Sequence, residues 1–261
     1  MMKIYIPTLN RVGTQGTLKV LPASVFKRYG AVLVCPRAEV VHHRSEWYAD
    51  LVEFMPCDTK GISATREAVI KHAAKQRDQV VLMLDDDLSS WGTRREQLDG
   101  GKPKYSSSSE PELLKGFAEL EALMKKHIHG SIGHRLFAQE LPPIYYNKRM
   151  LRALAYDAGA LVELGVRARV TVMEDFDVQL QLMKLGYASV TYNKIVQDQR
   201  ASQLPGGCST YRTIETQAQA ANKLAALHPD CVEVVERTVQ TGWNKGVRTD
   251  VRINWRKAFK K

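Results

Sequence analysis

An apolar strand that runs directly into three carboxylates is the feature that most constrains this chain. Residues 80–84 (VVLML) are apolar throughout, which is typical of a central strand that is covered on both faces of a sheet. Asp85, Asp86 and Asp87 follow without a break. Because ligands of open α/β sheets bind at the carboxyl ends of such strands, this position predicts a binding site.

The three adjacent carboxylates also indicate which ligand to expect. They repel one another, and a bound cation would relieve that repulsion. Hard oxygen ligands of this kind suit Mg²⁺ or Mn²⁺ that holds a substrate diphosphate. We therefore expect a divalent metal at this cluster, with a solvated acidic turn as the alternative.

The segments around this strand predict an α/β fold. Residues 3–8 (KIYIPT), 31–34 (AVLV) and 51–55 (LVEFM) are further apolar runs, with room for a helix between them. A helix that is opened by Ser63 precedes the acidic strand. Alternating strands and helices predict an α/β fold with a parallel sheet.

Later segments have a less regular pattern. Residues 89–110 are rich in Gly and Ser and predict a loop, whereas residues 169–173 (RVTVM) predict a strand. Two helical stretches from about residue 214 lead to a basic tail. We expect an α/β domain over residues 1–212 and a helical, basic C-terminal extension over residues 213–261 that packs on it.

Composition places the chain among ordinary globular proteins. It has 261 residues, of which 44% are hydrophobic and 25% are charged, which excludes a disordered or collagen-like chain. The four cysteines lie far apart, which predicts buried free thiols rather than a zinc or redox site. No stretch approaches the roughly 18 consecutive apolar residues of a membrane helix, so we expect a cytoplasmic protein without a membrane partner.

The charge balance favours an anionic partner. There are 38 basic and 28 acidic residues, and residues 245–261 alone contribute +6 of the net charge of +10. In this tail Arg252, Arg256 and Lys257 alternate with aromatic side chains such as Trp255. This composition suits phosphate backbones and base stacking, as in DNA binding, although a solvated basic helix or strand is the alternative.

A second acidic strand end is a candidate for catalysis. Glu174 and Asp175 follow residues 169–173, about ninety residues after the first acidic cluster. Carboxylates at such a strand-to-helix junction also cap helix N-termini, which is the structural alternative. Their place in the chain instead favours a general base opposite a metal-bound leaving group.

Polar residues at other strand and helix edges predict a nucleotide and phosphate cradle. The residues that would form it are Thr8, Arg11, Ser63 and Arg66. The later segment GGCSTYR combines close backbone approach at Gly207 with an aromatic and a cationic side chain, Tyr211 and Arg212. These three residues are candidates for acceptor binding, and a purely structural turn is equally compatible with them.

Together these motifs resemble those of GT-A fold glycosyltransferases, which use nucleotide sugars. The resemblance implies a GT-A-like (Rossmann-like) mixed, mostly parallel sheet that is flanked by helices. LDDD stands in the place of that fold's D-x-D motif, and MED stands in the place of its x-E-D motif. The segments PTLNR, ISATREAVIKHA and GGCSTYR narrow the resemblance to the phage and TET-associated glycosyltransferases of modified DNA. The match is scattered over about residues 3–212.

The resemblance implies a role for each matching position. Asp85 and Asp87 would bind the ribose edge and the metal, Asp86 would adjoin the nucleotide sugar, and Asp175 would be the general base. The implied nucleotide contacts are Thr8, Arg11 and Arg66. Many GT-A enzymes use a late histidine as a further metal ligand, and this chain has VQDQ there, so Asp198 is the nearest substitute.

These observations lead to one hypothesis and three alternatives. The hypothesis is metal-dependent, inverting transfer of a sugar from a nucleotide sugar, such as a UDP-sugar, to a 5-hydroxymethyl-type pyrimidine in DNA. The first alternative keeps the GT-A enzyme but gives it a sugar, lipid or protein acceptor. A haloacid-dehalogenase-like phosphatase, whose nucleophile strand also ends in D-x-D, and a non-catalytic DNA-binding protein are the other two.

Overall fold

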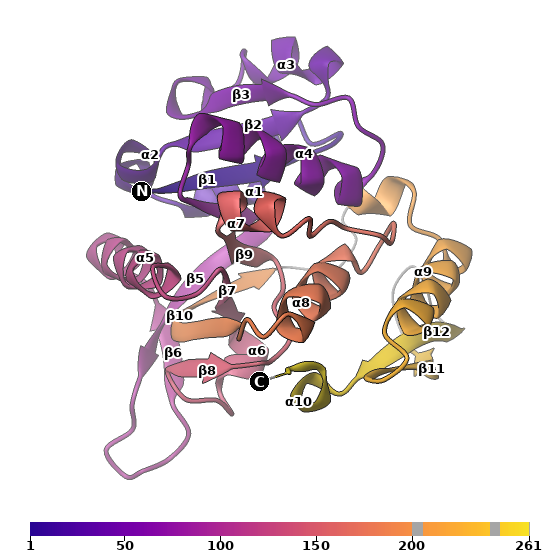
Figure 1. The fold of residues 1–261 in the computed structure, drawn as a ribbon. Helices are drawn as coiled ribbons and strands as arrows, with labels where there is room; N and C mark the ends of the chain where they lie inside the picture. Colours follow the sequence, from indigo (N-terminus) through magenta and orange to yellow (C-terminus); the bar gives the residue numbers. More distant parts are fainter. Residues whose placement is uncertain (200–205, 241–245, 261) are drawn as a thin grey trace.

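A mixed sheet of ten strands runs through the part of the chain that the computed structural model describes, residues 1–199, 206–240 and 246–260 (Figure 1). The strands lie in the order β3 (Glu53–Pro56), β2 (Ala31–Cys35), β1 (Met2–Pro7), β4 (Val80–Leu84), β9 (Ala153–Tyr156), β7 (His129–His134), β10 (Val190–Gln199), β5 (Leu88–Arg95) and β6 (Lys104–Ser107). β8 (Ile144–Tyr146) pairs with β10 outside this order.

Most strands of this sheet run in the same direction. β3, β2, β1 and β4 pair in parallel, and so do β7 and β10. The antiparallel strand β9 lies between β4 and β7, so the two parallel groups share one direction. β5 and β8 run against them, each paired to β10. The predicted mixed, mostly parallel α/β sheet is therefore confirmed.

Helices cover both faces of the sheet. They are α1 (Gly16–Val20), α2 (Ala23–Tyr29), α3 (Arg37–His43), α4 (Ile62–Gln76), α5 (Glu110–Met124), α6 (Arg135–Ala138), α7 (Ala158–Glu163), α8 (Glu174–Lys184), α9 (Ile214–Leu227) and α10 (Trp255–Ala258), with 3-10 turns η1 (Ala49–Leu51) and η2 (Gly207–Thr210). On β4, Leu82 packs in the core with α2 and α5, and Val81 packs in the core with α4 and α7. β4 is thus buried on both faces, as its apolar sequence predicts.

Residues 89–110, which we expected to form a loop, instead contain most of a β-hairpin. β5 pairs antiparallel with β10 on one side and with β6 on the other. Trp91 on β5 is only 4% exposed and packs edge-on against Phe117 of α5, with the ring centres 5.4 Å apart. Leu88 and Trp91 are the buried large apolar residues of this strand, and two such residues among polar ones give little periodic signal.

Residues 169–173, which we expected to form a strand, are irregular. The Arg169 backbone amide donates to Asp177 Oδ2 over 2.8 Å, and its guanidinium donates to Asp177 Oδ1 over 2.6 Å. The segment is therefore held against the first turns of α8 and does not join a ladder. Alternation of valines predicted a strand here, but a buried ion pair decides the conformation.

The C-terminal part contains one of the two expected helical stretches. α9 forms, and the chain then continues as an antiparallel hairpin of β11 (Val232–Val239) and β12 (Gly246–Ile253). This part lies beside α8 (Figure 1), and the edge of Trp255 meets the Phe176 ring with the centres 5.8 Å apart. β11 is rich in valine, a β-branched residue that is enriched in strands.

Two expectations from composition can be compared with the structure. The cysteines are free thiols, and Cys35, Cys57 and Cys231 are buried while Cys208 is half-buried. Among the described residues, no helix has the length and apolarity that crossing a bilayer requires.

Asp177 is the expected main anchor between α8 and the C-terminal part. It is fully buried, and His228 Nε2 lies 2.9 Å from its Oδ1. Burial alone would raise the pKa of Asp177, but hydrogen bonds with His228 and Arg169 outweigh burial and lower it. We predict that Asp177→Asn lowers the free energy of unfolding in urea by about 3 kcal/mol, because it breaks a buried charge pair.

A matched control lies on the same pair of elements. Asp230 pairs with Lys184 of α8 in a more exposed setting, with Asp230 37% exposed. Asp230→Asn should cost less than about 1 kcal/mol. Equal losses for the two variants would contradict the anchoring role of Asp177.

Candidate active site

A polar cavity lies where the carboxyl ends of β1 and β4 approach α8 and the C-terminal hairpin. Its volume is about 680 Å³. Thr8, Arg66 and Asp85 line it from the α/β sheet and its helices, and Arg248 and Arg252 line it from β12. This is the position at which α/β sheets bind their ligands.

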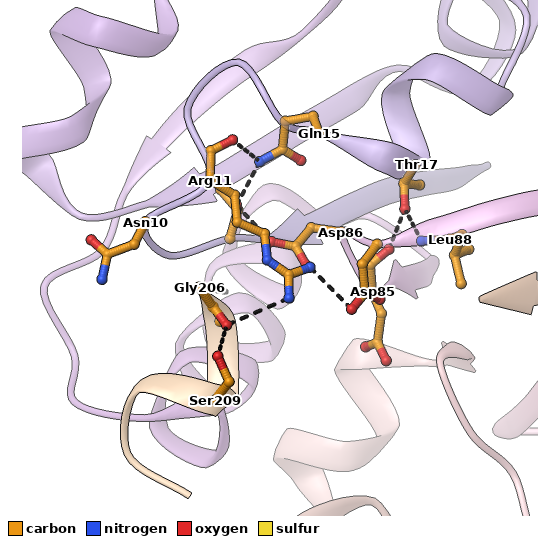
Figure 2. A network of polar contacts seen from close by, with 12 residues as sticks. Asn10, Arg11, Gln15, Thr17, Asp85, Asp86, Leu88, Gly206 and Ser209 are labelled. Atoms are coloured by element: carbon orange, nitrogen blue, oxygen red, sulfur yellow. Dashed lines mark hydrogen bonds and ion pairs between the residues drawn. The ribbon is translucent and has the colours of Figure 1, made fainter. Parts of the chain in front are cut away.

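Asp86 is a buried anchor in this cavity wall (Figure 2). Its Oδ2 accepts from the Thr8 hydroxyl over 2.7 Å, and its Oδ1 accepts from Arg11 Nη1 over 2.6 Å. The Gln15 side chain in turn donates to the Thr8 hydroxyl over 2.6 Å. Burial raises the pKa of Asp86 to about 7, against the opposing effects of Arg11 and Thr8. Because both carboxylate oxygens are engaged, Asp86 positions Arg11.

Hydrogen bonds from the start of α1 hold the backbone of the acidic cluster, residues 85–87, in place. The amides of Gly16 and Thr17 donate to the Asp86 carbonyl over 3.0 and 3.2 Å. The Thr17 hydroxyl donates to the Asp85 carbonyl and accepts from the Leu88 amide (Figure 2). A Cβ atom at Gly16 would lie 2.8 Å from the Leu88 carbonyl oxygen, so this close approach requires glycine.

Arg66 joins the two acidic clusters that the sequence separates by about ninety residues. Its Nη2 donates to Asp85 Oδ1 over 2.7 Å, and its Nη1 donates to Glu174 Oε1 over 2.6 Å. Burial raises the pKa of Glu174 to about 7, and Arg66 opposes that rise. The expected meeting of the LDDD and MED motifs is therefore present, and one guanidinium links them.

Asp87 retains an oxygen without a partner. Its Oδ2 lies 3.0 Å from Arg11 Nη1, whereas its Oδ1 is buried and has no hydrogen-bond partner among the described residues. Magnesium is commonly bound by one or two carboxylates together with substrate phosphates. The orphaned Asp87 oxygen, next to Asp85 in the same cavity wall, fits such a cation.

Asp198 does not complete a three-carboxylate metal site. Within the described ranges, no three His, Cys, Asp or Glu residues are grouped so that they could hold a metal ion. Asp198 Oδ1 instead lies 3.6 Å from His134 Nε2, and Asp198 is not part of the cavity lining. Asp198 as a third metal ligand stays a prediction, and in the structure β10 carries this side chain to His134 at the end of β7.

Asp175 lies between two cavities. It lines the polar cavity and also a second one of about 370 Å³ beside α4 and α7. Its neighbour Glu174 is only 6% exposed and is bonded to Arg66. Both predicted catalytic carboxylates line the two cavities, but Glu174 is engaged by Arg66 and Asp175 is the more exposed of the two.

Ser63 is not part of the predicted nucleotide cradle. α4 begins at Ile62 after Gly61, whose φ of 84° is in the left-handed region, so Ser63 lies within the first turn and does not cap the helix. Thr65 lines the cavity and Ser63 does not. The cradle residues that the structure does bring together are Thr8, Arg11, Arg66, Asp85 and Asp86.

The loop of Gly207, Tyr211 and Arg212 lines the same cavity. The Tyr211 hydroxyl accepts from the Ile62 amide over 2.8 Å, and the Gly207 amide donates to the Leu9 carbonyl over 2.7 Å. This loop is therefore bonded to the chain just after the carboxyl end of β1 and to the first residue of α4.

The basic tail divides into two parts. Arg252 on β12 lines the cavity, whereas Arg256 and Lys257 are exposed on α10 and do not line it. Lys245 and Lys261, which contribute to the tail's charge, lie outside the described residues.

Sequence reasoning missed several cavity arginines. They are Arg149, Arg152, Arg237 and Arg248. Single arginines in polar stretches form no motif, and only the fold shows that they face one space. For β12 the signal could have been the four-residue spacing of Arg248 and Arg252, which places both on one face of a strand.

Solved structures share this architecture. One is the mannosyltransferase PcManGT from Pyrobaculum calidifontis in complex with GDP-Man and Mn²⁺, with a TM-score of 0.56 and 14% sequence identity. The match covers 87% of this chain and 63% of that chain, so this chain spans less than two thirds of that enzyme's length. The fold is of the GT-A type, with acidic residues at the carboxyl end of its central strand.

A family profile identifies the enzyme family of this chain. The profile of the TET-associated glycosyltransferases matches residues 2–207, and the chain belongs to this family. Its curated relatives include the beta-glucosyl-HMC-alpha-glucosyl-transferases of Enterobacteria phages T2 and T6. Each is 24% identical over 246 residues, which cover 88% of this chain and 82% of the relative. This membership removes the phosphatase and the non-catalytic DNA-binding alternatives.

Removal of Arg66 should destabilise the protein in a pH-dependent way. Arg66 lowers the pKa values of Glu174 and Asp85, so without it both pKa values would rise further. A carboxyl whose pKa is higher in the folded than in the unfolded protein costs stability as the pH rises between those values. We predict that Arg66→Gln lowers the free energy of unfolding by about 3 kcal/mol at pH 8 and by less at pH 5.5.

Urea titrations at the two pH values would measure this difference. Arg37→Gln is a suitable control, because Arg37 and its partner Asp58 are 76% and 60% exposed. The control should change stability by at most about 0.5 kcal/mol at both pH values. The same loss for Arg66→Gln at both pH values would contradict the electrostatic role of Arg66.

Proposed function

We propose that this glycosyltransferase moves a sugar from a nucleotide sugar to a hydroxyl group of a 5-hydroxymethyl-type pyrimidine in DNA. The observation that carries the proposal is that the acidic cluster and the arginines of the C-terminal hairpin line one cavity. The first set suits a donor diphosphate, and the second suits the phosphates of a nucleic acid. The names of the T2 and T6 relatives, which refer to HMC, support the same acceptor class.

On the donor side, the ends of β1, β4 and α4 would bind the nucleotide. Thr8 and Arg11 lie next to Asp86, and Arg66 lies next to Asp85. A divalent cation, Mn²⁺ or Mg²⁺, would bind at Asp85 and the open oxygen of Asp87 and would offset charge on the departing nucleoside diphosphate. The loop of Gly207, Tyr211 and Arg212 is bonded to the chain just after β1 and to α4, so we assign it to nucleotide binding rather than to acceptor binding. A UDP-sugar is the proposed donor.

Asp175 is the proposed general base. It would accept the proton of the acceptor hydroxyl while that oxygen attacks the anomeric carbon, and Glu174 would hold Arg66 and thereby Asp85 in place. Attack from the face opposite the leaving group inverts the anomeric centre. A β-linked product from an α-linked donor is therefore expected. The names of the relatives state an α linkage, which is opposite to this expectation. The anomeric configuration of the product therefore tests the role of Asp175, and an α-linked product from an α-linked donor would contradict a simple base role.

On the acceptor side, β11 and β12 present the arginines. Arg237 and Arg248 share Asp250, at 3.5 and 2.8 Å, and Arg252 lies on the same strand as Arg248. Arg256 and Lys257 extend the positive surface beyond the cavity. A pyrimidine within a duplex would have to leave the base stack to reach Asp175, as it does in other enzymes that modify bases.

The reaction can be tested by mass spectrometry of nucleosides. Duplex DNA with 5-hydroxymethylcytosine, 5-hydroxymethyluracil or glucosylated 5-hydroxymethylcytosine would be incubated with a panel of nucleotide sugars and Mn²⁺. We predict a hexose- or pentose-sized mass gain on one of these nucleosides that is lost with EDTA. Asp175→Asn should reduce the rate by at least about 100-fold.

The exposed residue Asp50 provides the matched control. Asp50→Asn should retain the activity. Tight donor binding by the protein without transfer to any of these DNAs would move the acceptor to a sugar, lipid or protein. A mass gain that survives EDTA would exclude the metal from the mechanism.

DNA binding should depend on salt through the C-terminal arginines and lysines. Each lost phosphate contact lowers the slope of log affinity against log salt by about one. We predict that the double variant Arg252→Gln, Lys257→Gln lowers this slope by about two in fluorescence anisotropy titrations. The double variant Lys71→Gln, Lys75→Gln on α4 removes the same charge away from the hairpin and should leave it unchanged. An unchanged slope for the first variant would show that the DNA phosphates do not contact Arg252 and Lys257.

A further inference from the structure

Arg152 is held in an unusual backbone conformation beside the acidic cluster. Its φ is 64°, in the left-handed region that residues other than glycine and asparagine rarely adopt. Its carbonyl accepts a hydrogen bond from the Asp85 amide over 2.8 Å, directly before β9 pairs with β4. Such strain persists where the surroundings enforce it, and it often marks a functional position.

The side chain of Arg152 carries a charge that the protein leaves unsatisfied. Its Nη1 is buried and has no hydrogen-bond partner among the described residues. The guanidinium is within electrostatic range of Asp85, Asp87 and Asp198, but it makes no hydrogen bond or ion pair with them. Burial lowers the pKa of Arg152 in spite of these carboxylates. A buried donor without a partner is costly, and a bound anion that accepts from it would remove that cost.

The other cations near the cluster are already bonded. Arg66 is shared by Asp85 and Glu174, and Arg11 is bonded to Asp86 and Asp87. Arg149 lines the same cavity and lies over the Phe176 ring at 4.8 Å. Arg11 and Arg66 are thus each ion-paired to two carboxylates, whereas the Nη1 atom of Arg152 is a terminal donor that no described residue accepts from.

Given the proposed donor site, we propose that Arg152 binds the donor diphosphate and opposes metal binding until that diphosphate is present. Without a nucleotide, the positive charge of Arg152 repels a second cation at Asp85 and Asp87. With a nucleotide, the phosphates are attracted both to Arg152 and to the metal. The nucleotide and the metal would then each increase the other's affinity, as linkage requires.

Two binding measurements test this proposal without turnover. Calorimetry with UDP in EDTA measures diphosphate binding alone, and electron paramagnetic resonance of free Mn²⁺ measures metal binding alone. In Arg152→Gln we expect about tenfold weaker UDP binding, since one charge-assisted contact is lost. We expect Mn²⁺ alone to bind more tightly, by about threefold or more, since a repulsive charge is removed. A purely structural role for Arg152 would not strengthen metal binding.

Arg152→Gly guards against a folding defect, because glycine accepts the left-handed backbone without strain. Arg77 provides the control, since it is exposed at the end of α4 and has a similar φ of 59°. Arg77→Gly should bind UDP and Mn²⁺ as the wild type does. Arg152→Gly should repeat both changes of Arg152→Gln.

The outcomes distinguish a failure of the proposed role of Arg152 from a failure of the proposed donor site. If the wild type binds UDP and both Arg152 variants bind it equally well, the role of Arg152 in diphosphate binding is overturned. If UDP binding falls but Mn²⁺ alone binds no more tightly, the opposition between Arg152 and the metal is overturned. If the wild type binds neither UDP nor other nucleoside diphosphates, with or without Mn²⁺, the proposed donor site fails as well.

Discussion

The architecture of this site depends on two arginines that neutralise carboxylates at the end of a buried strand. Arg66 links Asp85 to Glu174, and Arg11 links Asp86 to Asp87. Carboxylates buried without such partners would cost several kcal/mol each. The arginines allow an acidic cluster to persist where the fold binds its ligands, and they also fix β1, α4 and α8 relative to β4.

Helix α8 connects the cavity to the C-terminal part of the chain. Its first turn carries Glu174 and Asp175 at the cavity. The same turn carries Asp177, whose bond to His228 holds the C-terminal part in place. The distance between the proposed base and the arginines of β12 is therefore set by one short, buried segment. The proposed transfer from a small donor to a large nucleic acid gives a physical reason for such a rigid link.

Sequence patterns predicted the elements whose signal is local. The apolar run before Asp85 identified a central strand, and its position predicted the binding edge. The β5–β6 hairpin was missed because Leu88 and Trp91 are its two buried anchors in an otherwise polar segment. The strand predicted at residues 169–173 does not form because Arg169 is bonded to Asp177. Asp198 followed from a motif position, but only the coordinates show that its side chain faces His134. Arg152 has no sequence signature, because neither its φ nor its neighbours can be inferred from a pattern.

The most direct test of the account is anomalous diffraction at the manganese edge from crystals grown with Mn²⁺ and a nucleoside diphosphate. The account predicts one manganese peak beside the open oxygen of Asp87, with the diphosphate between the metal and Arg152. Manganese or nucleotide bound away from the carboxyl end of β4, for example in the cavity beside α7, would contradict it.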